Sequence, residues 1–112
     1  MKNELIERRC EPCEGGVAPL PADAARELLT ALHEDWSISD DGLSISRSFE
    51  FPAYSRTLGF ANAVAWIAIA EGHHPVLTIS YGSCSVEYST HAVNGLTDND
   101  FICAAKIDRI PL

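Results

Sequence analysis

The chain has 112 residues and 46% of them are hydrophobic, which is enough for one domain with a single core and argues against wholesale disorder. Acidic residues outnumber basic ones by 16 to 8, and the net charge of -8 argues against nucleic acid and anionic membranes as partners, because phosphate binding needs clustered Lys and Arg. No apolar run approaches the roughly 20 residues that span a bilayer, and no apolar signal segment follows Met1, so we expect a cytoplasmic protein with reduced cysteines.

Residues 1–19 are expected to form an N-terminal tail, and residues 20–112 a single domain. The tail carries charged residues, prolines and a Gly-Gly pair without a sustained hydrophobic period. Its one motif is a CxxC, Cys10-Glu11-Pro12-Cys13, which suits half of a zinc site or a redox pair. A structural zinc needs four ligands, and no second CxxC or matching histidine pair follows, so we favour a tail without metal or redox chemistry.

A first helix is expected from Pro21, because proline suits the first turn of a helix and Asp23 suits its positive end. His33, near the end of this helix, is interpreted as a surface histidine. The apolar face of the helix has the spacing i, i+3, i+4, i+7 and consists of Ala25, Leu28, Leu29 and Leu32.

Two hairpins are expected. The first has strands over residues 36–39 and 43–51 around Asp40-Asp41-Gly42, since Asp-Gly between strand-like runs is a strong turn signal. Hydrophobic residues alternate with serines in its second strand, which predicts one covered face and one polar face. The second hairpin has strands over residues 76–81 and 84–90 around a Gly-Ser pair.

Residues 53–70 show the longest helical pattern, and apolar residues occupy most of its sides. Such a helix needs more than one covering neighbour. In so small a domain we expect it to pack on the sheet and on other copies of the chain, in a homodimer or homotetramer. Gly72 suits the left-handed residue that ends a helix, and Pro75 prevents continuation.

A last helix is expected after Thr97-Asp98-Asn99-Asp100, which has the form of a capping box in which Thr97 accepts a hydrogen bond from the backbone of Asp100. The elements then run helix, strand, strand, helix, strand, strand, helix. This order predicts an α+β fold, a four-stranded antiparallel sheet with three helices on one face.

Three of the four histidines lie at junctions between these elements, as His73-His74 and as His91. An unperturbed histidine pKa of about 6.5 allows proton transfer near neutral pH, so we interpret the three as a candidate acid–base centre. A metal site would need them to converge on one ion, and adjacent histidines on an extended backbone rarely both bind one metal. We therefore expect no metal.

The segments around these histidines resemble the signature of the pterin-4a-carbinolamine dehydratase family, bacterial type. The pieces that carry the resemblance are Glu71-Gly72-His73-His74-Pro75, Ser89-Thr90-His91 and Gly95-Leu96-Thr97-Asp98-Asn99-Asp100-Phe101-Ile102. His-His-Pro alone is a weak signal, whereas its combination with the other two pieces is specific. The resemblance covers roughly residues 20–108, and the CxxC also resembles some bacterial members.

The resemblance implies a lyase that dehydrates 4a-hydroxytetrahydropterin (pterin-4a-carbinolamine) to quinonoid dihydropterin and water, without a metal or organic cofactor. The reaction recycles the tetrahydrobiopterin cofactor of aromatic amino acid hydroxylases, so phenylalanine hydroxylase would be a functional partner. His73 and His91 would transfer protons and His74 would position the substrate. By position, the resemblance assigns the pterin site to Gly72, His73, His74, Pro75, Ser89, Thr90, His91, Ala92 and Asp100.

Two alternatives stay open. Asp100 is also interpretable as a plain carboxylate at a helix N-terminus. The whole protein is also interpretable as a non-catalytic oligomeric binding partner, since some animal relatives act as dimerisation cofactors of a transcription factor through their helical surface. The apolar helix suits either function, whereas three histidines favour the enzyme.

The chain departs from the family pattern at Leu77, where tryptophan is common, and at Ile69, where an acidic residue is common.

Overall fold

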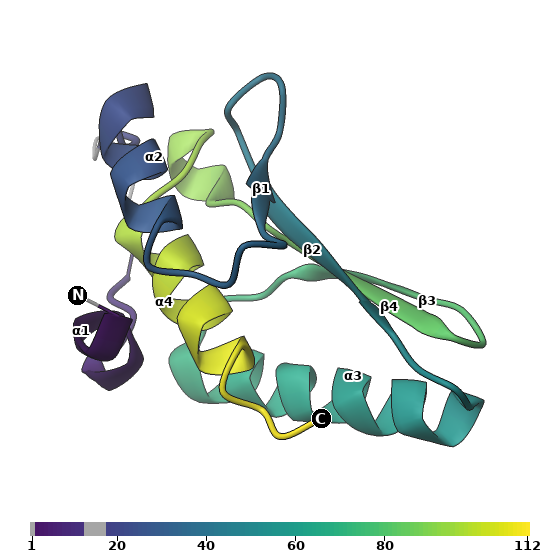
Figure 1. Cartoon of the computed structure of the whole chain (residues 1–112). Coiled ribbons are helices and arrows are strands. Elements are labelled where there is room, and N and C mark those ends of the chain that lie inside the picture. Colours follow the sequence, from purple (N-terminus) through teal and green to yellow (C-terminus); the bar gives the residue numbers. More distant parts are fainter. Residues whose placement is uncertain (1, 13–17) are drawn as a thin grey trace.

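The computed structural model describes residues 2–12 and 18–112 of the chain (Figure 1). The expected α+β class with a four-stranded antiparallel sheet is confirmed. The described residues contain one α-helix more than the three expected, because the six-residue α1 is too short to show a hydrophobic period in the sequence. In chain order the elements are α1 (Lys2–Glu7), α2 (Ala22–Leu29), β1 (Ser37–Ile38), β2 (Ile45–Glu50), α3 (Tyr54–Glu71), β3 (Val76–Ile79), β4 (Ser83–Tyr88), the 3-10 helix η1 (His91–Val93) and α4 (Asp98–Ile107).

The strands lie in the order β1-β2-β4-β3, and each neighbouring pair is antiparallel. The helices gather on one side of this sheet (Figure 1). The strand side chains buried beneath them are Ile45, Phe49, Cys84, Val86 and Tyr88. The opposite face is polar and carries Ser46, Ser48, Ser85 and Glu87. One face of the sheet therefore belongs to the core and the other does not, as the alternation with period two requires.

The first hairpin has shorter strands than its pattern suggested. Its turn is held by the Asp41 carboxylate, which accepts hydrogen bonds from the Ser39 hydroxyl at 2.6 Å and from the Leu43 amide at 3.0 Å. Gly42 has a φ of 76°, a left-handed conformation that glycine adopts without strain. Because this turn extends through Leu43, that side chain stays exposed and the strand begins at Ile45.

The long helix α3 ends as the sequence predicted, at Gly72 with a φ of 67°. The amides of Gly72 and His73 donate back to the carbonyls of Ile69 and Ala68, at 3.3 and 3.2 Å, which satisfies the last turn. His73 and His74 therefore lie on the short connection between the end of α3 and the start of β3.

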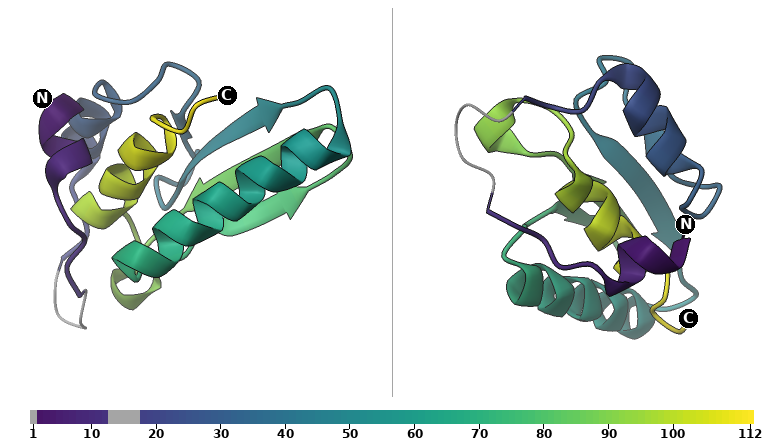
Figure 2. Two further views of the ribbon diagram at one scale, coloured as in Figure 1. Left: turned by 90° about the horizontal axis from the view of Figure 1, so that it is seen from below. Right: turned by 90° about the vertical axis from the view of Figure 1, so that its left-hand side faces the viewer.

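The core is centred on α4, whose side chains Phe101, Ile102, Cys103 and Ala104 are almost completely buried. The helix α1 packs on α4 from the side away from the sheet (Figure 2), with Leu5 buried and the Lys106 ammonium donating to the Ile6 carbonyl at 2.8 Å. The segment interpreted as a tail thus contains a helix that joins the core, while the domain boundary at residue 20 stays a prediction. Among the described residues, no helix has both the length and the apolar character needed to cross a bilayer.

Candidate active site

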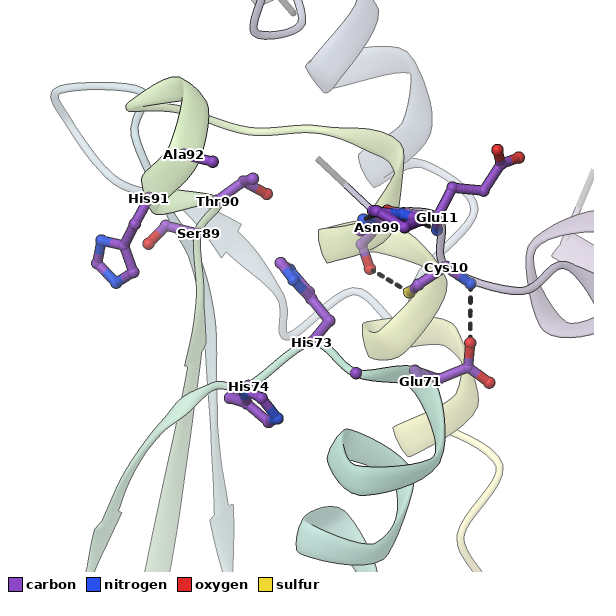
Figure 3. A pocket seen from close by; sticks show the side chains of 12 residues that line it. Cys10, Glu11, Glu71, His73, His74, Ser89, Thr90, His91, Ala92 and Asn99 are labelled. Carbon is purple, nitrogen blue, oxygen red and sulfur yellow. Dashed lines mark hydrogen bonds between the residues drawn. The ribbon is translucent and has the colours of Figure 1, made fainter. Parts of the chain in front are cut away.

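A cavity of about 460 Å³ opens where four parts of the chain meet (Figure 3). These parts are the end of α3, the end of β4 with η1, the first turn of α4, and the extended residues that follow α1. The residues that line the cavity are Cys10, Glu11, Pro12, Glu71, Gly72, His73, His74, Ser89, Thr90, His91, Ala92 and Asn99. The cavity thus brings together the three histidines that the sequence singled out.

His73 and Asp100 form a buried pair at this cavity. The imidazole Nε2 lies 2.6 Å from the carboxylate Oδ1, with 12% of the His73 side chain and 0% of the Asp100 side chain exposed. An ionised carboxylate only accepts hydrogen bonds, so Nε2 carries the hydrogen between them. His73 lines the cavity, whereas Asp100 is fully buried and does not. The remaining ring nitrogen, Nδ1, is therefore the one through which His73 can exchange a proton with a bound molecule.

The second oxygen of Asp100 is fully used by the fold. Its Oδ2 accepts the Thr97 amide hydrogen at 3.0 Å, which is one arm of the expected capping box, and the Thr90 hydroxyl hydrogen at 2.8 Å. The helix dipole of α4 also favours a negative charge in its first turn. Asp100 is thus both a helix N-terminal carboxylate and the partner of His73, so the two interpretations of this residue are compatible.

This pair changes the protonation of His73. Burial of the imidazole opposes its positive charge, but the hydrogen bond and the negative charge of Asp100 outweigh that effect, and the pKa of His73 is raised above its ordinary value. The Tyr88 ring stacks on the imidazole with centroids 5.2 Å apart and planes at 13°, and its hydroxyl donates to the His73 carbonyl at 3.3 Å. His73 is therefore held in one orientation, and its charged form is more stable than that of a free imidazole.

His74 and His91 are both exposed and reach the cavity from other directions (Figure 3). His74 directly follows His73, and Figure 3 shows the two neighbouring side chains pointing to different sides. His91 begins η1, just after β4. Of the other residues assigned to the pterin site, Gly72, Ser89, Thr90 and Ala92 line the cavity, whereas Pro75 does not and precedes β3.

Five residues of the lining were not among those expected at the pterin site: Cys10, Glu11, Pro12, Glu71 and Asn99. The first three come from the segment interpreted as a tail, and their neighbours in space are 61 and 88 positions away in the sequence, so no local pattern reports the contact. The CxxC interpretation rests partly on Cys13, which lies outside the described residues. Cys10 itself has its sulfur 3.6 Å from that of Cys103. Among the described residues, no group of three or more His, Cys, Asp or Glu side chains is placed to hold a metal ion.

The two departures from the family pattern lie away from the cavity lining. Leu77 is partly buried and packs against the core on the inner face of β3. Ile69 is 67% exposed on the outer side of α3.

Fold and site together define an α+β protein with a histidine–carboxylate pair and two further histidines around one cavity. The family model described as pterin 4 alpha carbinolamine dehydratase matches residues 18–110, and the chain belongs to this family. The chain is 50% identical over 107 residues to a Nitrosomonas eutropha protein, covering 96% of this chain and 93% of the relative. It is 46% identical over 110 residues to a Legionella pneumophila protein, covering 98% and 97%. Both relatives carry the name "Putative pterin-4-alpha-carbinolamine dehydratase".

Two solved structures are also similar. A structure from Brucella melitensis, described as a transcriptional coactivator/pterin dehydratase, has 34% sequence identity and a TM-score of 0.74 over 80% of this chain and 94% of that one. A pterin dehydratase-like protein described as a RuBisCO assembly factor has 19% identity and a TM-score of 0.58 over 68% and 88%. At that identity the second likeness concerns the fold alone.

Proposed function

We propose that the protein dehydrates 4a-hydroxytetrahydropterin to quinonoid dihydropterin and water. The observation that carries this proposal is the buried His73–Asp100 pair beside a cavity that His74 and His91 also line. The family to which the chain belongs supports a pterin as the substrate. The product is the oxidised form of the cofactor that aromatic amino acid hydroxylases need, so a hydroxylase such as phenylalanine hydroxylase would supply the substrate.

The reaction is redox-neutral and needs two proton transfers. The C4a–O bond breaks as its hydroxyl takes a proton and leaves as water, and N5 loses its proton as the C4a=N5 double bond forms. The raised pKa of His73 favours the protonated form, which is the form that delivers a proton to the leaving hydroxyl. His91 then serves as the base towards N5, and His74 binds and orients the pterin. General acid–base catalysis of this kind contributes about 10²–10⁴-fold.

The test follows the decay of 4a-hydroxytetrahydrobiopterin generated by phenylalanine hydroxylase, by absorbance, with and without the protein. Wild type is expected to accelerate the decay, and His91→Ala is expected to lose most of that acceleration. The matched control is His33→Ala, because His33 is also partly exposed but lies outside the cavity. A folded wild type that leaves the decay unchanged would refute the proposal.

A second candidate function is a binding role, and it rests on the outer side of α3, where Trp66 is 69% exposed and Ile69 is 67% exposed. An apolar surface of this kind suits contact with another protein chain. Another copy of the same chain, in a homodimer or homotetramer, would cover it. A protein with this surface but no dehydratase activity would favour the binding role over the enzyme.

A further inference from the structure

The segment of residues 8–12 follows α1, and Figure 3 shows its Cys10 and Glu11 along one side of the candidate active site. Three of its residues, Cys10, Glu11 and Pro12, line the cavity, and Figure 3 shows Cys10 and Glu11 across from His91 and Ser89. The family model matches the chain only from residue 18 onward. This side of the cavity is therefore formed by residues that precede the span matched by the family model.

The side chain of Asn99 holds this segment through the backbone groups of Glu11. Its Oδ1 accepts the Glu11 amide hydrogen at 3.1 Å, and its Nδ2 donates to the Glu11 carbonyl at 2.6 Å. The oxygen and the nitrogen of the Asn99 amide thus pair with the N–H and the C=O of Glu11. A neighbouring β-strand would satisfy the same two backbone groups. Asn99 is only 7% exposed, so these hydrogen bonds are shielded from competing water.

Glu71 holds the same segment from the other helix. Its Oε1 accepts the Cys10 amide hydrogen at 2.8 Å, while its Oε2 lies 3.1 Å from Arg9 and 3.6 Å from Lys106. Burial of the carboxylate raises its pKa, but the Cys10 amide and the two positive charges outweigh this, and the pKa of Glu71 is lowered. Glu71 is therefore ionised at neutral pH and fixes Cys10 at the cavity.

The two anchors, Asn99 and Glu71, are close in sequence to the residues of the His73–Asp100 pair. Asn99 directly precedes Asp100, and Glu71 stands two residues before His73. The two helix ends that bring His73 and Asp100 together therefore also hold residues 8–12 against the cavity. A shift of either anchor would move the segment relative to the histidines.

We propose that residues 8–12 are a substrate-binding wall of the active site, held in place by Asn99 and Glu71, and that this wall binds the pterin without taking part in proton transfer. The inference rests on the proposed function. Figure 3 shows the Glu11 carboxylate directed away from the histidines. The hydrogen bond to Cys103 and burial raise the pKa of the Cys10 thiol, which stays protonated at neutral pH. The wall thus contacts the pterin and shapes its binding site, while the histidines transfer the protons.

Asn99→Ala tests the wall in the whole chain. Loss of both hydrogen bonds to Glu11 is expected to raise KM about tenfold while kcat changes less than about twofold, because binding is lost in ground state and transition state alike. The matched control is Asn62→Ala, an exposed asparagine on α3 away from the cavity, which is expected to keep the wild-type KM. A folded Asn99→Ala protein with an unchanged KM would refute the proposal that residues 8–12 bind the pterin. The proposed function would still hold in that case if the wild-type protein catalyses the dehydration.

A second measurement does not depend on the folding of a variant. Hydrogen–deuterium exchange of the peptide containing residues 8–12 is followed in wild type with and without saturating 7,8-dihydrobiopterin, with binding checked by fluorescence. Bound dihydrobiopterin is expected to slow exchange in this peptide. Unchanged exchange with the ligand bound would overturn the wall alone. A wild type that neither binds dihydrobiopterin nor accelerates dehydration would overturn the proposed function and, with it, the wall as a pterin-binding element.

Discussion

Oδ1 of Asp100 lies 2.6 Å from Nε2 of His73, across 27 positions of sequence. The contact joins the first turn of α4 to the residue just after the C-cap of α3. The other oxygen of Asp100 is taken by Thr90 and by the Thr97 backbone. Because the carboxylate is fully buried and does not line the cavity, we expect it to act on a bound molecule only through the imidazole. Under the proposed function Asp100 would be a positioning residue, whose charge raises the pKa of His73.

Asp100→Asn keeps the size of the side chain and removes its charge. Burial would then act on His73 without an opposing negative charge, so the pKa of His73 is expected to fall. We expect kcat to drop about 10–100-fold, and the alkaline limb of its pH profile to move to lower pH. The measurement is the pH dependence of kcat for wild type, Asp100→Asn and the control Asp98→Asn. Asp98 belongs to the same turn but pairs with the exposed Arg8, so its profile is expected to stay in place.

The same contact predicts how stability depends on pH. The pKa of His73 in the folded protein is raised above the unfolded value of about 6.5. The stabilisation that the charged His73–Asp100 pair gives the fold is therefore fully present below about pH 6.5, and it is lost as the pH rises through the folded pKa. Replacement of the imidazole in His73→Gln is therefore expected to reduce the free energy of unfolding more at about pH 6 than at about pH 9. Urea denaturation at both pH values measures this difference. An equal loss at both would contradict it, and His33→Gln, at an exposed pair, serves as the control.

The Thr90 hydroxyl contributes to the support of Asp100, and its removal is expected to destabilise the fold. Thr90→Val keeps the shape of the side chain but leaves Asp100 Oδ2 without one of its donors. The expected loss is about 1–3 kcal/mol of the free energy of unfolding. Thr78→Val, on the exposed face of β3, is the matched control and is expected to stay close to wild type. Equal stability of the two variants in urea would show that the buried hydroxyl contributes nothing.

The exposed side of α3 predicts self-association. A charge in place of Trp66, as in Trp66→Glu, is expected to weaken contact between copies of the chain, because an interface would have to bury the new carboxylate. Light scattering on protein eluting from a sizing column compares the masses. Leu112→Glu places the same charge on an exposed apolar residue at the C-terminus and is expected to keep the wild-type mass. A wild type that elutes as a monomer would contradict the prediction.

Local signals in the sequence were sufficient for much of the fold. Gly72 and Pro75 marked the end of α3, and Thr97 with Asp100 marked the start of α4, because each signal concerns backbone groups within one turn. The alternation of serine with hydrophobic residues likewise predicted which face of β2 is buried. These are short-range effects, and a single sequence records them directly.

Other features depend on contacts that no local pattern contains. Asp100 was recognised as a cap and as a residue near the site, but its contact with His73 needs the packing of α4 against the end of α3. The segment after α1 looked like a tail because its partners, Glu71 and Asn99, lie far along the chain. Leu77 stands where tryptophan is common in the family, and the packing of β3 directs its side chain into the core.

The place of residues 8–12 has a practical consequence for work on this family. A gene trimmed to the span that the family model recognises, residues 18–110, would remove α1 with its buried Leu5 and one side of the cavity. Kinetic values from such a shortened protein would describe a different pocket from that of the 112-residue chain. Comparisons of substrate preference between relatives should therefore align the segments that precede the family span, and not only the histidine motifs.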